Sequence, residues 1–202
     1  DHSSLTFSLL YKFENGLDPQ LTQWLNLWPA LAVYQALVEL GIDTVSLKWP
    51  NDVLVNSKKV AGILCEIRRD SQIRQMTVGI GVNVDQPAHV FTSELQTAGS
   101  LFSLTGEYIG QKKLLQTIVN QLDILLEKYI VSENCPAIRK HWLAACGHLG
   151  KPVKIIRNGS TLTGNFIGLT ESGLPEIESK GDLKIVDDYE SFSLRQLYDF
   201  DH

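Results

Sequence analysis

The sequence changes its pattern near residues 147–150, and this change limits the folds open to the chain. Before it, strand-like stretches alternate with helical ones. After it, five short strand-like stretches follow one another within about 50 residues, separated by turns such as Asn158-Gly159, Ser172-Gly173 and Lys180-Gly181. Short strands joined by tight turns are typical of a small β-barrel. We therefore predict two domains, residues 1–147 and residues 148–202.

The first domain is predicted to have an α+β fold. Apolar residues alternate over residues 5–13, which indicates a half-buried strand that Asn15-Gly16 ends. Residues 20–40 are helical in character, although Pro29 is expected to break or kink that helix. Further strands are expected at residues 44–48, 53–55, 59–68 and 75–84, and further helices at residues 112–129 and 136–146.

Composition argues against several classes of protein. The net charge of −5 and the pI near 5.5 leave no basic face for a nucleic-acid backbone, so no DNA partner is expected. Three cysteines without CxxC spacing (Cys65, Cys135 and Cys146) argue against a disulfide framework and a zinc site. They fit a reducing cytoplasm, where we expect the protein. No run of about 18 apolar residues occurs, so no membrane span is expected.

One short string combines a cation, a turn and a carboxylate, namely Lys48-Trp49-Pro50-Asn51-Asp52. By itself this pentapeptide is equally consistent with an exposed turn. Its continuation favours a binding site, because Lys59 opens a strand that contains Gly62, where a ligand can approach the backbone closely. A lysine beside a glycine-bearing strand is a plausible clamp for an anion.

A second candidate is Val78-Gly79-Ile80-Gly81-Val82-Asn83. It is not a dinucleotide-binding fingerprint, because no helix follows and the third glycine is missing. The two glycines either make room for a packed neighbour or leave a bare strand surface for a flat ligand. In the second case the Asn83 amide offers a donor and an acceptor suited to adenine. The histidines lack metal-ligand spacing, so no metal site is expected.

Together these residues resemble biotin–protein ligases. The Lys48–Asp52 string, the strand Lys59-Val60-Ala61-Gly62-Ile63-Leu64 and the Gly79–Asn83 stretch occur in the order and approximate spacing of that family. The resemblance covers nearly the whole chain. It implies part of a class II synthetase-like biotin/lipoate ligase fold, with a mixed sheet and helices, followed by an SH3-like β-barrel. Lipoate ligases share this fold, but the Lys-Trp-Pro-Asn-Asp string favours biotin.

The resemblance also implies a two-step reaction. Biotin and MgATP form biotinyl-5′-AMP, which then acylates one lysine of a carboxylase carrier domain. Lys59 would bridge the biotin carboxylate and the phosphate, and Asp52 would act near the reacting centre, on the acceptor lysine or on Mg²⁺. The other implied contacts are to biotin from Gly62, Leu64, Gly79 and Gly81, and to ATP from Asn83 and Arg195. The family often forms homodimers through its sheet.

Three interpretations stay open. In the family, a Gly-Arg-Gly-Arg-Arg-Gly loop precedes the strand at Phe7 and shields the adenylate from water, and we expect this chain to begin inside the domain, after that loop. The leading interpretation is therefore the C-terminal portion of a ligase catalytic domain plus its barrel. The second is a non-catalytic remnant or split subunit that binds biotin or a nucleotide. The third is a lipoate ligase.

Overall fold

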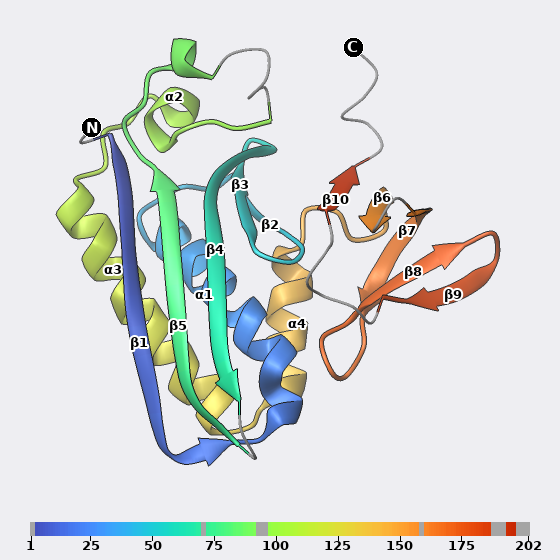
Figure 1. Cartoon of the computed structure of the whole chain (residues 1–202). Helices are drawn as coiled ribbons and strands as arrows, with labels where there is room; N and C mark the ends of the chain where they lie inside the picture. Colours follow the sequence, from blue (N-terminus) through green and yellow to red (C-terminus); the bar gives the residue numbers. More distant parts are fainter. Residues whose placement is uncertain (1–2, 70–71, 92–96, 158–159, 187–192, 197–202) are drawn as a thin grey trace.

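Two five-stranded antiparallel sheets organise the protein in a computed structural model that describes residues 3–69, 72–91, 97–157, 160–186 and 193–196. The first sheet has the order β1-β5-β4-β3-β2 (Figure 1). Its strands are β1 (Ser4–Leu17), β2 (Val45–Lys48), β3 (Asp52–Val55), β4 (Lys58–Arg69) and β5 (Ile73–Asn83). The expected strands and the α+β class are confirmed. The expected mixed sheet is wrong, because every ladder between these strands is antiparallel and the described parallel pairings are two isolated bridges.

Helices cover one face of this sheet and leave the other face without a helix (Figure 1). The covering helices are α1 (Thr22–Glu39), α3 (Gln111–Leu125) and α4 (Cys135–Ala145). A π-helical turn (Leu126–Val131) follows α3, and the short helix α2 (Leu101–Thr105), absent from the expected elements, lies near the end of β5. Within the described part of the chain, no helix is both long and apolar enough to cross a membrane.

Burial alternates along the central strand β5 and identifies the core face. Met76, Val78, Ile80 and Val82 are buried beneath the helices, whereas the residues between them lie on the open face. Gly81 lies between Gly62 of β4 and Thr6 of β1, and Gly79 lies between Leu64 and Ser8. The period of two therefore places these small residues together on the open face.

Helix α1 continues through Pro29, so of the expected break or kink the break is wrong and the kink stays a prediction. The helix is a single element from Thr22 to Glu39 and has Pro29 inside it. A proline inside a helix costs about 3 kcal/mol. Eleven residues of α1 are buried, including Trp24, Trp28 and Leu31, and burying one large apolar side chain contributes about 2 kcal/mol. Burial on every side of this helix outweighs the cost of its proline.

Strand β1 also extends past the turn that was expected to end it. Asn15 and Gly16 lie within β1, where the pairing with β5 shifts register between Lys12 and Leu17. Gly16 has a φ of 70°, which is favourable for glycine and strained for other residues. The Asn-Gly pair therefore forms an irregularity within the strand, because pairing of Leu17 with Ile73 continues the ladder beyond it.

The second sheet contains the short strands expected after residue 150, in the order β10-β6-β7-β8-β9 (Figure 1). They are β6 (Pro152–Arg157), β7 (Ser160–Leu169), β8 (Pro175–Ser179), β9 (Asp182–Ile185) and β10 (Ser193–Gln196). Among the described residues, β9 and β10 form no ladder with each other, so the described pairings make an open sheet. Closure into an SH3-like barrel and the boundary at residue 147 stay predictions.

Residues 146–148 join the two sheets. Cys146 forms a parallel bridge with Leu47 of β2, and the amide of Gly147 donates to the Leu47 carbonyl at 2.9 Å. His148 is fully buried, and its ring centroid lies 4.4 Å from that of Phe166 in β7. Burial, with the Lys48 and Lys151 charges, lowers the pKa of His148 to about 3, so the imidazole is neutral at physiological pH. We call residues 146–148 the joint.

Candidate active site

The turn between β2 and β3 is fastened at two of its residues. Trp49 is buried in the core, and a cis peptide bond joins it to Pro50. The Asn51 side-chain amide donates to the Ile63 carbonyl at 2.6 Å, and the Ile63 amide donates to the Asn51 carbonyl at 3.1 Å. These bonds fix the turn on β4, so that Asp52 pairs in register with Gly62.

A β-bulge directs Lys59 onto the open face. Lys59 and Gly62 are three residues apart and would point to opposite faces of a regular strand. The register between β3 and β4 shifts at this point, and Val60 and Ala61 are both buried although they are neighbours. The extra residue therefore brings Lys59 to the same face as Gly62. There its ammonium group forms an ion pair with the Asp52 carboxylate.

Gly62 makes room for the lysine itself. A Cβ atom at this position would lie 3.2 Å from both Cε and Nζ of Lys59, closer than ordinary packing allows. Gly81 is different, because a Cβ atom there would meet nothing within 4 Å. The sequence-based argument proposed close ligand approach for both glycines. The surroundings of Gly81 fit that role, whereas Gly62 first of all accommodates the Lys59 side chain.

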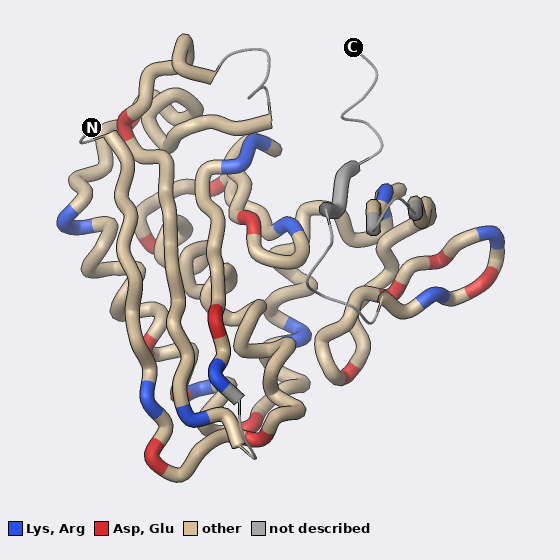
Figure 2. Tube along the Cα trace, in the orientation of Figure 1, with Lys and Arg blue, Asp and Glu red and all other residues tan. Residues whose placement is uncertain are grey.

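The open face beside Lys59 carries small, hydroxyl and leucine side chains, and its charges on β4 begin further along, at Glu66 and Arg68. Leu64 of β4 is 64% exposed and Leu10 of β1 is 57% exposed. Charged residues are absent from residues 4–11 of β1 and 75–83 of β5, as Figure 2 shows. A cation beside small and uncharged side chains suits a ligand with a carboxylate and an uncharged body.

Asn83 lies at the end of β5 on the same face, and part of its hydrogen-bonding capacity is already used. Its side-chain Nδ2 donates to the Gly99 carbonyl at 3.0 Å, and its Oδ1 accepts from Nε2 of Gln86 at 3.3 Å. An asparagine amide has two donor hydrogens and two acceptor lone pairs. One of each is therefore left for a ligand.

The structure brings most of the sequence-predicted site residues onto one face. These are Asp52, Lys59, Gly62, Leu64, Gly79, Gly81 and Asn83. Arg195 belongs to β10, where its backbone pairs with Lys154. Its side chain lies outside the described part of the chain, so its expected contact with ATP stays a prediction.

The sequence-based argument missed the two hydroxyl residues of β1 that complete the face. Thr6 pairs with Gly81, and Ser8 pairs with Gly79. A Cβ atom on Gly79 would lie 3.7 Å from the Ser8 hydroxyl oxygen. Alternation along β1 already assigned both residues to its polar side. Their position beside the glycines depends on the antiparallel register with β5, which one strand does not reveal.

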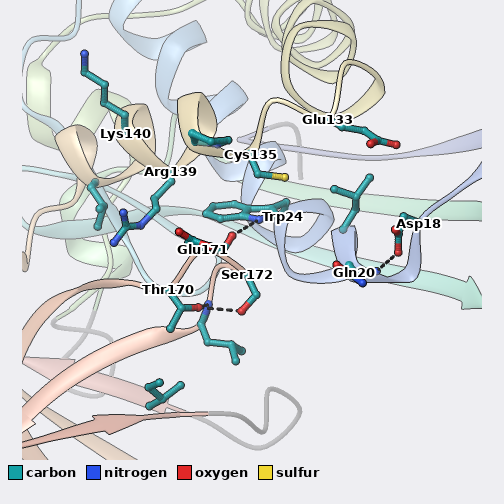
Figure 3. Close-up of a pocket in the computed structure, with 15 residues that line it drawn as sticks. Asp18, Gln20, Trp24, Glu133, Cys135, Arg139, Lys140, Thr170, Glu171 and Ser172 are labelled. Atoms are coloured by element: carbon teal, nitrogen blue, oxygen red, sulfur yellow. Dashed lines mark hydrogen bonds between the residues drawn. The ribbon is translucent and has the colours of Figure 1, made fainter.

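A separate cleft of about 1050 Å³ lies between α1, α4 and the turn from β7 to β8 (Figure 3). Trp24 donates from its indole nitrogen to the Glu171 carbonyl at 3.2 Å, and Arg139 donates to the Leu169 carbonyl at 2.6 Å. The cleft is lined by none of the site residues predicted from the sequence. Within the described residues, no three His, Cys, Asp or Glu side chains gather in a way that would hold a metal ion.

Comparison with known sequences points to one family. Residues 1–83 match the biotin/lipoate A/B protein ligase family. The chain is 30% identical over 167 residues to the bifunctional ligase/repressor BirA of Bacillus subtilis, covering 82% of this chain and 51% of the relative. It is 33% identical over 150 residues to the biotin–[acetyl-CoA-carboxylase] ligase of Paracoccus denitrificans, covering 71% of this chain and 62% of that protein.

Comparison with solved structures gives the same result. The biotin protein ligase of Aquifex aeolicus, in complex with biotin and ATP, superposes with a TM-score of 0.81 at 31% identity. The match covers 96% of this chain and 79% of that one. The chain thus spans most of this solved ligase, but only about half the length of the Bacillus subtilis relative.

Proposed function

This chain belongs to the biotin protein ligase family, and from that membership we propose that its open sheet face takes part in ATP-dependent attachment of biotin to a protein lysine. The proposal rests on one observation, the Lys59–Asp52 ion pair beside the uncharged stretch of β5 that carries Gly79 and Gly81. Biotin has a carboxylate at the end of an aliphatic chain, so its shape and charge fit this arrangement. The carboxylate would lie at Lys59.

The first step joins two anions that repel each other. An oxygen of the biotin carboxylate attacks the α-phosphorus of ATP, and pyrophosphate leaves with the electrons of the broken phosphorus–oxygen bond. Lys59 would stabilise the charge shared by the carboxylate and the phosphate. Asp52 holds the ammonium group over Gly62 and therefore fixes where that charge is available.

The second step transfers biotin to the acceptor. The lysine amine attacks the acyl carbon of biotinyl-5′-AMP, an amide bond forms, and AMP leaves with the electrons of the broken carbon–oxygen bond. The amine loses a proton, and we propose Asp52 as its acceptor because this carboxylate lies beside the reacting centre. The name of the Paracoccus denitrificans relative supports a carboxylase carrier domain as the acceptor.

The remaining site residues are assigned by their position on the face. Gly62, Leu64, Gly79 and Gly81 would line the biotin site, and the free donor and acceptor of Asn83 would face the nucleotide. Arg195 would reach the phosphates of ATP, with Mg²⁺ entering as part of MgATP. An SH3-like closure of the second sheet and a homodimer belong to the same proposal.

A two-step assay with purified protein tests the proposal. Biotin-dependent pyrophosphate release measures the first step, and transfer of labelled biotin to a carrier domain measures the second. Replacing Lys59 by alanine should slow the first step by about 100-fold or more, because one electrostatic contact to a developing charge is worth that much. Lys113→Ala, which removes an exposed lysine of α3, is the matched control and should leave both rates unchanged.

The same assay separates the alternatives. Equal rates for wild type and Lys59→Ala would contradict the assignment of Lys59. Binding of biotin without pyrophosphate release would favour a binding module or split subunit, and faster turnover with lipoate than with biotin would favour a lipoate ligase.

A further inference from the structure

Residues 97–99 lie beside Lys59 and are joined to it through backbone hydrogen bonds. The amide of Lys59 donates to the Thr97 carbonyl at 2.8 Å, and the amide of Gly99 donates to the Lys59 carbonyl at 2.9 Å. Ala98 forms a parallel bridge with Lys59. Both backbone hydrogen-bonding groups of Lys59 are therefore bonded to this one segment.

The segment is in turn fastened to the end of β5 by one side chain. Nδ2 of Asn83 donates to the Gly99 carbonyl at 3.0 Å, and Gln86 donates to Oδ1 of Asn83 at 3.3 Å. Gln86 also donates to the Ser4 hydroxyl at 2.5 Å. Since these bonds fix which end of the Asn83 amide points toward Gly99, the orientation of that amide is set before any ligand binds.

A second attachment restrains the same segment from its other end. Ser100 is fully buried, caps α2 by accepting from the Ser103 amide at 2.9 Å, and donates to the Gln86 carbonyl at 2.5 Å. A Cβ atom on Gly99 would lie 2.7 Å from a methyl carbon of Leu104, so the segment packs tightly on α2. Gly99 is therefore held between Asn83 and the cap of α2.

We infer that Asn83 is a positioning residue for Lys59 and acts through the backbone of Gly99. The inference deepens the proposed function and rests on it, because it concerns the lysine assigned to the biotin carboxylate. The Lys59 side chain must fit over Gly62 and reach Asp52, so a small displacement of its backbone moves the ammonium group away from the carboxylate site. Asn83 thus supports biotin binding in addition to any contact with the nucleotide.

Biotin titration without any nucleotide separates this role from an adenine contact. Asn83→Asp keeps the size of the side chain and replaces the donor to Gly99 with an acceptor. It should weaken biotin binding by about fivefold, the effect of one hydrogen bond of roughly 1 kcal/mol. Ser100→Ala should weaken biotin binding in the same direction, although Ser100 is fully buried and has no access to a nucleotide. Asn120→Ala, an exposed asparagine of α3, is the control and should bind like wild type.

Hydrogen exchange of the Lys59 and Gly99 amides provides a readout that needs no ligand. Both amides should exchange about fivefold faster in Asn83→Asp than in wild type, while amides of α3 keep their rates. Unchanged biotin affinity, or unchanged exchange at these two amides, would overturn the inference. If the wild type binds no biotin, the proposed function fails, and hydrogen exchange alone then decides whether Asn83 holds Lys59.

Discussion

The hairpin of β2 and β3 has contrasting surroundings on its two sides. On the β3 side, Asp52 and Lys59 form an ion pair at a partly exposed face with glycines. On the β2 side, the joint buries a neutral imidazole between aromatic rings, with His148 against Phe166 and Trp142. One short hairpin therefore connects the surface where we propose that a carboxylate ligand binds with a packed junction between two sheets.

The two regions have different roles: we propose that the open face binds a ligand and that the joint holds the two sheets together. The open face has three glycines side by side and exposed leucines, so it gains little stability from packing and leaves space for a ligand. The joint has no space, and its bonds to Leu47 hold the strand from which the site turn emerges. Substitutions on the open face should therefore change affinity, whereas substitutions in the joint should change stability.

The largest expected effect is on the open face. Gly81→Val should reduce biotin affinity by about 30-fold, because overfilling a site costs roughly 2 kcal/mol. The melting temperature should stay near that of wild type, since a Cβ atom there meets nothing within 4 Å and valine favours strands. Calorimetric titration with biotin and thermal unfolding followed by tryptophan fluorescence would measure both quantities.

The contrasting variant lies in the second sheet. A Cβ atom on Gly164 would lie 2.3 Å from the Glu178 carbonyl oxygen, so Gly164→Val should lower the melting temperature. If Gly81→Val instead destabilised the protein and kept its biotin affinity, the division between the two regions would be wrong.

The sequence predicted most of the strands and the candidate site residues, but not the geometry that brings them together. Alternation and turn residues located the strands, and the glycine-rich stretches predicted a binding face whose residues the sheet brings together. The face to which Lys59 points could not be predicted, because it depends on a bulge at Val60. A bulge leaves no periodic pattern in the sequence. His148 was grouped with scattered histidines, since its burial arises from packing between elements far apart in the sequence.

The next effect is a pH dependence that originates in the joint. The pKa of His148 is lowered to about 3 by burial and by the charges of Lys48 and Lys151, against a hydrogen bond with the Leu47 backbone that raises it. Burial raises the pKa of the neighbouring Cys146 thiol to about 12, so this group stays neutral. Below pH 6.5 the unfolded chain binds a proton that the folded protein excludes. The free energy of unfolding should then fall by about 1.4 kcal/mol per pH unit.

Comparison with His148→Phe isolates this contribution. Urea unfolding of both proteins at pH 7 and at pH 5.5 gives the difference in their unfolding free energies. That difference should shift in favour of the variant as the pH falls, since phenylalanine keeps an aromatic ring and binds no proton. Identical pH profiles for the two proteins would mean that His148 is not buried as a neutral group.

The smallest expected effect tests how closely the joint fits β2. A Cβ atom on Gly147 would lie 2.8 Å from the Ser46 hydroxyl oxygen and 3.1 Å from its Cβ, so Gly147→Ala should cost about 1 kcal/mol of unfolding free energy. The clash involves one side chain, and Ser46→Gly should therefore recover most of the loss in the double variant. Additive losses in the double variant would show that the joint and β2 do not touch there. Recovery would mean that contact with the Ser46 side chain of β2 sets the fit of the joint.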